Sequence, residues 1–344
     1  MHAAVTERVG SISVIDRPDP DDPGPGEVLV RPEAVGICGS DYHFFAGELS
    51  DAAGGSQFPR VQGHEVGATI AAVGPACRPG LEVGQRVALW PLSACGRCYP
   101  CSVGRPNACD NFELIGIHLD GGLQESLITG QEHVFPIETS DGAIAAMTEP
   151  VSVAVRAVRR ARITPGERVV VLGAGPIGQC VTLVARELGA AVLMIDIQEQ
   201  RLAIGRALGA ETLVWSTADE VVAAARDWGG SGGPPVAVDA TGVPAAVRAM
   251  VDMVASAGRA VQVGMSTAEV PLRIGSLTEK EIDLLGVSCA NADDFAEAVA
   301  VVERNGDSIG RLISHEFPLA QAPDALRFAI NNPTQVMKVM IRNG

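Results

Sequence analysis

Four cysteines lie close together in the first third of the chain, at positions 95, 98, 101 and 109. Their spacing, C-x2-C-x2-C-x7-C, is typical of a loop in which four thiolates surround one zinc ion. Such an ion would order a Pro- and Gly-bearing segment that has little apolar content of its own. We expect Cys95, Cys98, Cys101 and Cys109 to form a structural site, because four thiolates leave no open coordination position. An iron–sulfur cluster is the alternative for the same thiolates.

A second group of possible metal ligands is dispersed over the first 150 residues. Cys38 stands in Gly-Ile-Cys-Gly-Ser-Asp, His64 and Glu65 in Gly-His-Glu, and Glu149 in Thr-Glu-Pro. Each residue alone is explained equally well as a buried thiol, a hydrogen-bonded ring or a solvated carboxylate. Together, one sulfur, one nitrogen and carboxylate oxygens can hold zinc and leave a position for water or substrate. The set therefore predicts a second, catalytic zinc site.

A glycine-rich turn follows the β-branched run Arg168–Leu172 and precedes the helical pattern 179–188. Gly173 would allow the tight turn, Gly175 would let the backbone approach a pyrophosphate, and Gly178 would let the helix pack on the strand. The phosphates would then lie at the helix N-terminus. The segment predicts a dinucleotide site.

Asp196 ends the next predicted strand, 18 positions after Gly178 (196 minus 178). A carboxylate at this spacing accepts hydrogen bonds from the adenosine ribose hydroxyls and repels a phosphate on that ribose. NAD is therefore expected in preference to NADP; the alternative is a plain glycine turn with a surface aspartate. The cofactor-binding residues expected here are Gly173, Gly175, Pro176, Ile177, Gly178, Asp196 and Arg201.

The pattern of elements that must position these residues changes near residue 150. Before it, short β-like runs such as Val28–Arg31, Glu65–Val73 and Arg86–Leu89 predict an irregular antiparallel, barrel-like domain. After it, helix-length segments alternate with buried apolar strands, which is typical of a doubly wound parallel sheet. We therefore expect an α/β protein in which residues 1–150 and 290–344 form a catalytic domain and residues 151–289 a Rossmann domain.

Two structural features are predicted for the C-terminal part of the chain. A helix is predicted over Asp293–Arg304, with an end at Asn305 and Gly306. The segment Phe317–Ile341 is expected to return to the first domain.

Composition limits the partners and the compartment. The formal net charge is −15, and the only basic cluster is Arg156–Arg162, so a nucleic-acid partner is not expected. No run reaches the roughly 18 apolar residues that a membrane span requires. The first ten residues lack the apolar block of a secretory signal, so a cytoplasmic location is expected, and the cysteines are read as metal ligands or thiols.

On these motifs and their order, the chain resembles the zinc-dependent medium-chain dehydrogenase/reductase superfamily. The resemblance covers nearly the whole chain and implies a chaperonin-cofactor-like (GroES-like), β-rich catalytic domain built from both ends. It also implies that Cys38, His64 and Glu65 surround the catalytic zinc, with Glu149 either a ligand or bonded to the zinc water. Glu149 stands where the animal alcohol dehydrogenases carry Cys, so the chain is similar to the polyol, sugar-acid and threonine branch.

The expected activity is a zinc-dependent, NAD-linked oxidation of a secondary alcohol to a ketone, on a small polar polyol or sugar-derived substrate. Ser40 is the expected first proton acceptor and His43, three residues on, the next carrier. A turn-capping hydroxyl and a surface ring are the alternatives for these two residues. The segment Glu281–Cys289 is expected to be an edge strand in a homodimer or homotetramer.

Two alternative functions are considered for the same motifs, one catalytic and one non-catalytic. Oxidation of threonine or another amino alcohol uses the same carbinol chemistry. A non-catalytic nucleotide-binding protein on the same scaffold would be expected to lose Cys38, His64 or Glu149, and all three are present.

Overall fold

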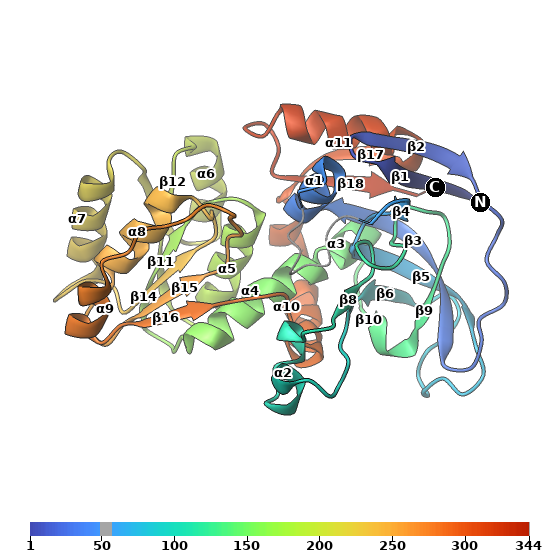
Figure 1. Cartoon of the computed structure of the whole chain (residues 1–344), viewed down its shortest axis with the longest axis horizontal. Helices are drawn as coiled ribbons and strands as arrows, with labels where there is room; N and C mark the ends of the chain where they lie inside the picture. Colours follow the sequence, from blue (N-terminus) through green and yellow to red (C-terminus); the bar gives the residue numbers. More distant parts are fainter. Residues whose placement is uncertain (49–56, 344) are drawn as a thin grey trace. The chain divides into compact units, whose positions relative to one another are not determined.

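The computed structural model describes residues 1–48 and 57–343, and within it the chain divides into two compact units (Figure 1). One unit consists of Met1–Glu149 and Ala290–Gly344, and the other of Pro150–Cys289. The division falls in the first turn of helix α4 (Thr148–Ala161).

The first unit is built around a seven-stranded sheet in the order β10-β6-β5-β3-β18-β17, with β9 also paired to β3. A three-stranded sheet, β2-β1-β4, and the pair β7-β8 complete its β-structure. The large sheet contains β3 (Glu27–Ile37), β5 (Glu65–Val73), β6 (Arg86–Leu89), β9 (Leu127–Gly130), β10 (Val134–Pro136), β17 (Ile313–Pro318) and β18 (Lys338–Arg342). The smaller sheets contain β1 (His2–Arg8), β2 (Ser11–Asp16), β4 (Arg60–Val61), β7 (Leu92–Ser93) and β8 (Glu113–Leu114).

The pairing of β3 with β5 brings two chemically important segments together. The strands run antiparallel, and Gly36 near the end of β3 is the partner of Glu65 at the start of β5. Antiparallel partners lie within about 5.5 Å of each other at Cα. The residues that follow β3, beginning with Cys38, therefore lie beside His64.

The C-terminal segment returns to this sheet, as the sequence predicted. Strand β18 runs antiparallel to β3, with Val339 the partner of Ile37. This register places Lys338 at the same end of β3 as Cys38. The return explains why 149 residues at one end and 55 at the other (290 to 344) form one unit.

Helix α10 (Ala292–Gly310) is kinked at the position where the sequence predicted its end. Asn305 does leave helical geometry, with φ −122° and ψ 22°, but the helix resumes after this kink. The Asn305 side chain donates to the Val301 carbonyl at 2.9 Å, and Ile309 in the following turn is fully buried. The end predicted at Asn305 therefore coincides with the kink between two helical segments, and the sequence did not predict the second segment, which continues to Gly310.

The second unit contains a six-stranded, all-parallel sheet in the order β13-β12-β11-β14-β15-β16. Its strands are β11 (Arg168–Leu172), β12 (Ala191–Asp196), β13 (Glu211–Val214), β14 (Val236–Asp239), β15 (Arg259–Gln262) and β16 (Asp283–Gly286). Numbered within the unit this order is 3-2-1-4-5-6, that of a Rossmann domain. The central strands are buried on both faces, which explains their continuous apolar runs.

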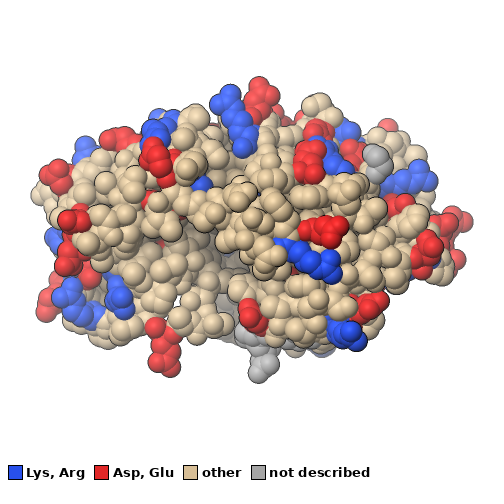
Figure 2. Space-filling view, turned by 90° about the horizontal axis from the view of Figure 1, so that it is seen from above, with Lys and Arg blue, Asp and Glu red and all other residues tan. Residues whose placement is uncertain are grey.

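Helices connect these strands in both units. Besides α4 and α10, they are α1 (Gly39–Ala46), α2 (Tyr99–Ser102), α3 (Gly142–Ala146), α5 (Pro176–Glu187), α6 (Glu199–Ala207), α7 (Ala218–Gly229), α8 (Pro244–Met253), α9 (Ile274–Lys280) and α11 (Ala322–Asn331). Within the described part of the chain, no helix combines the length and the apolar character needed to span a bilayer. On the face drawn in Figure 2, basic and acidic side chains are interspersed.

Candidate metal centres and cofactor site

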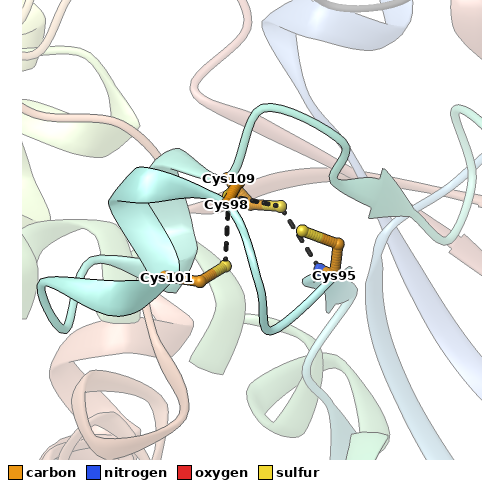
Figure 3. A group of neighbouring side chains, drawn as sticks. All are labelled: Cys95, Cys98, Cys101 and Cys109. Carbon is orange, nitrogen blue, oxygen red and sulfur yellow. Dashed lines mark hydrogen bonds between the residues drawn. The ribbon is translucent and has the colours of Figure 1, made fainter.

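The four cysteines of the predicted structural site converge on one point (Figure 3). Their sulfur atoms all lie within 4.8 Å of one another. Cys98 Sγ is 3.4 Å from Cys101 Sγ and 3.6 Å from Cys109 Sγ. A zinc ion with Zn–S bonds of about 2.3 Å requires tetrahedral S···S edges of ~3.8 Å. The cluster therefore has the dimensions of a four-thiolate zinc site.

The electrostatics of this cluster also favour a bound cation. Backbone N–H groups of Arg97 and Cys98 lower the pKa of the Cys95 thiol to about 6. Burial, together with its hydrogen bond to Cys98, raises the pKa of the Cys101 thiol to about 12. The Cys95 thiolate is thus stabilised by the loop, whereas the Cys101 thiol ionises beside it only when a positive ion is present.

A second cluster in the same unit contains Cys38, His64 and Glu65, whose possible ligand atoms lie within 4.8 Å of one another. Cys38 immediately follows β3 and precedes α1. His64 and Glu65 stand at the start of β5, after Gly63, whose φ of +95° is in the left-handed region that favours glycine. The predicted catalytic ligands are therefore brought together by the end of one strand and the start of its partner.

Glu65 is also one half of a buried ion pair. Lys338 Nζ donates to both carboxylate oxygens, at 2.6 and 2.7 Å, and to the Ile37 carbonyl at 3.3 Å. Burial would lower the pKa of Lys338, but the Glu65 carboxylate raises it above its ordinary value. Gly36 makes room for this arrangement, because a Cβ there would lie 2.0 Å from Glu65 Oε2.

Two further carboxyl groups lie beside the cluster: Asp41 is buried and Glu149 is partly buried. Glu149, at the start of α4, is outside the group of three mutually close ligand residues, but burial raises its pKa to about 7 against an opposing effect of His64. Burial likewise raises the pKa of Asp41. Asp41 Oδ2 accepts the Cys38 N–H at 2.9 Å, and Oδ1 lies 3.8 Å from His64 Nδ1.

The pKa of His64 is affected by the acidic groups around it. Burial by itself would lower its pKa, yet Asp41, Cys38 and Glu149 raise it well above the ordinary value. Its buried Nδ1 has no hydrogen-bond partner among the described residues. Three carboxyl groups and one thiol surround the ring, with Lys338 as their buried counter-charge, so the pocket favours an additional cation. With sulfur, imidazole and carboxylate as donors, the residues fit zinc.

The two residues predicted to move the proton lie on α1. Ser40 Oγ is 3.4 Å from His64 Nε2, so its hydroxyl borders the cluster. His43 is one turn further along the same helix, where residues three apart share a face. Its ring is half exposed and lies 3.2 Å from the Glu48 carboxylate.

The glycine turn of the second unit joins β11 to α5, as predicted. Gly173 has φ +97°, and a Cβ at Gly178 would lie 1.8 Å from the Gly173 carbonyl oxygen. These two glycines are required by the protein itself. Gly175 is different: its φ is −72°, and a Cβ would meet nothing within 4 Å. The open space beside it suits the close approach of a ligand to the backbone.

Asp196, at the end of β12, is anchored to this turn. Its two oxygens accept the N–H groups of Ala174 at 2.7 Å and Gln198 at 2.8 Å. A carboxylate has about four acceptor positions, so capacity remains for ribose hydroxyls. Arg201 follows in α6, and its carbonyl accepts from the buried Gln179 amide at 2.8 Å.

Comparison with known proteins follows the same division. Residues 24–139 match the family described as Alcohol dehydrogenase GroES-like domain, and residues 176–304 match Zinc-binding dehydrogenase. The chain is 33% identical to L-galactonate-5-dehydrogenase of Escherichia coli K12, over 93% of this chain and 92% of that protein. It is 30% identical to sorbitol dehydrogenase of Bacillus subtilis, over 99% and 97%.

This chain belongs to the zinc-containing alcohol dehydrogenase family. The solved structure of the alcohol dehydrogenase RspB of Escherichia coli, in complex with NADH, superimposes with a TM-score of 0.89 at 30% identity, over 99% of each chain. The predicted GroES-like and Rossmann architecture is thereby confirmed. As a zinc-dependent dehydrogenase, the enzyme is an oxidoreductase of CH–OH groups.

Two residues of the site had no role in the sequence prediction. Asp41 stands three positions after Cys38, a spacing typical of a helix capping box, and that pattern was the available signal. Lys338 had no signal of its own, because its partner Glu65 is 273 positions away.

The buried ion pair leads to a prediction about stability. Lys338→Met leaves the Glu65 carboxylate buried without its partner, so we expect a loss of about 3–5 kcal/mol. Lys338→Met/Glu65→Gln should recover part of that loss in thermal denaturation. An additive double-variant effect would contradict the pairing.

The glycine turn leads to a second prediction. Gly175→Ala should weaken NADH binding by tenfold or more at an unchanged melting temperature, because the new methyl group meets only the ligand. Gly178→Ala should destabilise the protein by about 1–3 kcal/mol, since its methyl group overlaps the Gly173 carbonyl. Fluorescence titration with NADH and thermal denaturation separate the two effects; equal losses of stability would refute this assignment.

Proposed function

We propose that this enzyme oxidises a secondary alcohol of a polyol or sugar-derived substrate to a ketone, with NAD as the hydride acceptor. The observation that carries the proposal is the convergence of Cys38, His64 and Glu65 on one point. Glu149 and the relatives named for galactonate and sorbitol support the substrate class. Bound NAD would supply the acceptor for the hydride of the carbinol carbon, and residues of this chain would carry the hydroxyl proton away.

In this proposal Cys38 and His64 hold zinc together with Glu65 or Glu149, and the four-cysteine loop holds the structural ion. Zinc at the first site supplies a Lewis acid that lowers the pKa of the substrate hydroxyl. Ser40 accepts the hydroxyl proton, because its own hydroxyl can donate and accept in the same step. His43, beside Glu48, is the next carrier toward solvent.

The deciding experiment is a substrate panel with measured zinc content. Polyols, sugar acids, threonine and simple alcohols are assayed with NAD and NADP by the appearance of reduced cofactor. We expect a polyol or sugar acid to be oxidised fastest and two zinc ions per chain. A clear preference for threonine would identify an amino-alcohol dehydrogenase instead.

The control for this experiment is His64→Ala, which removes one ligand of the proposed catalytic ion. Turnover should fall on the order of a thousandfold, the loss of several kcal/mol of Lewis-acid stabilisation. The zinc of the four-cysteine loop should be retained. Wild-type protein with zinc only in that loop and no turnover would support a non-catalytic nucleotide-binding protein.

For the cofactor, we propose that Asp196 selects NAD. A 2′-phosphate on the ribose would lie beside the Asp196 carboxylate, which accepts two backbone N–H groups. The carboxylate cannot rotate away from the phosphate without losing both hydrogen bonds. Asp196→Ser should raise the KM for NAD about tenfold and narrow the preference over NADP, as measured by initial rates. Equal use of both cofactors by the wild-type enzyme would contradict this role.

For the assembly, we propose a homodimer or homotetramer formed through β16. This strand lies at the end of the parallel sheet and, among the described residues, pairs only with β15. Leu284 on it is 42% exposed. An unprotected edge of this kind can pair across a two-fold axis. Leu284→Lys should shift the sedimentation coefficient to that of the monomer; a wild-type monomer would exclude the proposal.

A further inference from the structure

Three buried polar side chains run in a row from the first strand to the catalytic cluster. Thr6 in β1, Gln62 and Asp41 are each 2% exposed or less. Thr6 Oγ1 donates to Gln62 Oε1 at 2.6 Å. Gln62 Nε2 donates to the Asp41 backbone carbonyl at 3.0 Å and to Asp41 Oδ1 at 3.2 Å. Asp41 Oδ1 in turn faces His64 Nδ1.

The chemistry of these groups sets the direction of the row. Both Asp41 atoms that Gln62 contacts are oxygens that accept hydrogen bonds, so Gln62 must present its NH2 group to them. Its carbonyl oxygen then points toward Thr6, where the hydroxyl donates. Loss of the Thr6 hydroxyl would leave Gln62 Oε1 buried without this partner. Thr6 therefore holds the amide orientation that Asp41 requires.

The surroundings of the row are apolar. Beside Asp41 and Gln62 is a cavity of about 10 Å³, lined otherwise by Ile12, Ile37, Leu123, Ala322 and Leu326. Polar groups in such surroundings are costly unless they are hydrogen-bonded. Without Gln62, Asp41 Oδ1 would lose the hydrogen bond from its amide, and the carboxylate could rotate about the bond that Oδ2 accepts from Cys38 N–H.

We propose that Thr6 and Gln62 are positioning residues for the catalytic zinc. They hold Asp41 with one oxygen on the Cys38 N–H and the other facing His64 Nδ1. The carboxylate thereby couples the positions of two zinc ligands, and His64 Nε2 is left to face the metal. Outer partners of this kind orient metal-binding histidines. The inference rests on the proposed function, because it requires the catalytic ion.

The test compares the zinc-loaded wild-type enzyme with three variants that remove parts of the row, one control variant and one rescue variant. Thr6→Val removes the hydroxyl at nearly constant volume, Gln62→Leu removes the amide, and the double variant removes both. Gln124→Leu is the matched control: this glutamine is also buried in the first unit, but its amide donates to the Gly121 carbonyl at 2.8 Å. Zinc per chain, the rate of zinc removal by a chelator, and the visible spectrum after cobalt substitution are measured.

We expect the catalytic ion to be lost about tenfold faster in Thr6→Val and Gln62→Leu, at the lower end of the 10–100-fold effect of direct outer partners. Release from the four-cysteine loop should be unchanged. The double variant should lose zinc no faster than Gln62→Leu, because both residues act through Asp41. Thr6→Ser, which keeps the hydroxyl, should behave as wild type, and the cobalt spectrum should change only where zinc loss is faster.

A purely structural role gives a different result. If zinc loss in Thr6→Val and Gln62→Leu stays within twofold of wild type, while the melting temperature falls as in Gln124→Leu, the inference is overturned. Should Gln62→Leu fail to fold, Thr6→Val with its Thr6→Ser rescue decides alone. Wild-type protein with one zinc per chain would refute the proposed function itself, whereas two zinc ions and unaffected variants refute only the positioning role.

Discussion

An excess of buried and partly buried acidic groups around His64 is the constraint on which the catalytic unit depends. Cys38, Asp41, Glu65 and Glu149 lie about the ring, and Lys338 is the buried cation paired with Glu65. Unpaired buried charge is costly, so the unit requires a further positive ion or bound protons. Without a metal ion, the raised pKa values of Glu149 and His64 favour bound protons on these two side chains. A divalent cation would neutralise the excess negative charge and leave the ligands unprotonated.

The two candidate metal centres differ in how far apart their residues lie in the sequence. The four-cysteine loop takes all its ligands from a 15-residue segment, Cys95 to Cys109, so it needs little from the rest of the fold. The His64 cluster takes its residues from the ends of strands β3, β5 and β18 and from the start of α4. Its geometry therefore depends on strand register, and a shift of one residue in β5 or β18 would turn Glu65 or Lys338 to the opposite face of the sheet.

Glycines decide how closely these elements approach. Gly36 lets the Glu65 carboxylate lie against β3, and Gly178 lets α5 lie against the turn after β11. In both places a methyl group would overlap an oxygen atom at 2.0 Å or less. Apart from its chain neighbours, no described residue has an atom within 4 Å of where a Cβ of Gly175 would stand, so we assign Gly175 to contact with a ligand. The same residue type thus serves internal packing in two positions and recognition in the third.

The sequence by itself determined the features whose signals are local. The spacing of four cysteines, the glycine turn between a strand and a helix, and the apolar runs of β5, β6 and β11 each lie within one short segment. Family resemblance then supplied the architecture. The stop at Asn305 is a local signal and coincides with the kink in α10, whereas no local signal indicated the helical segment that follows it and carries the buried Ile309.

Only the tertiary structure decided which side chains face the catalytic cluster from outside these motifs. Lys338 reaches Glu65 because β18 pairs with β3, and Thr6 reaches Asp41 through Gln62. These contacts join residues up to 273 positions apart, and neither spacing nor periodicity encodes such a separation. Strand pairing and burial select them, because a polar group enclosed by the core must find its partner wherever the chain returns.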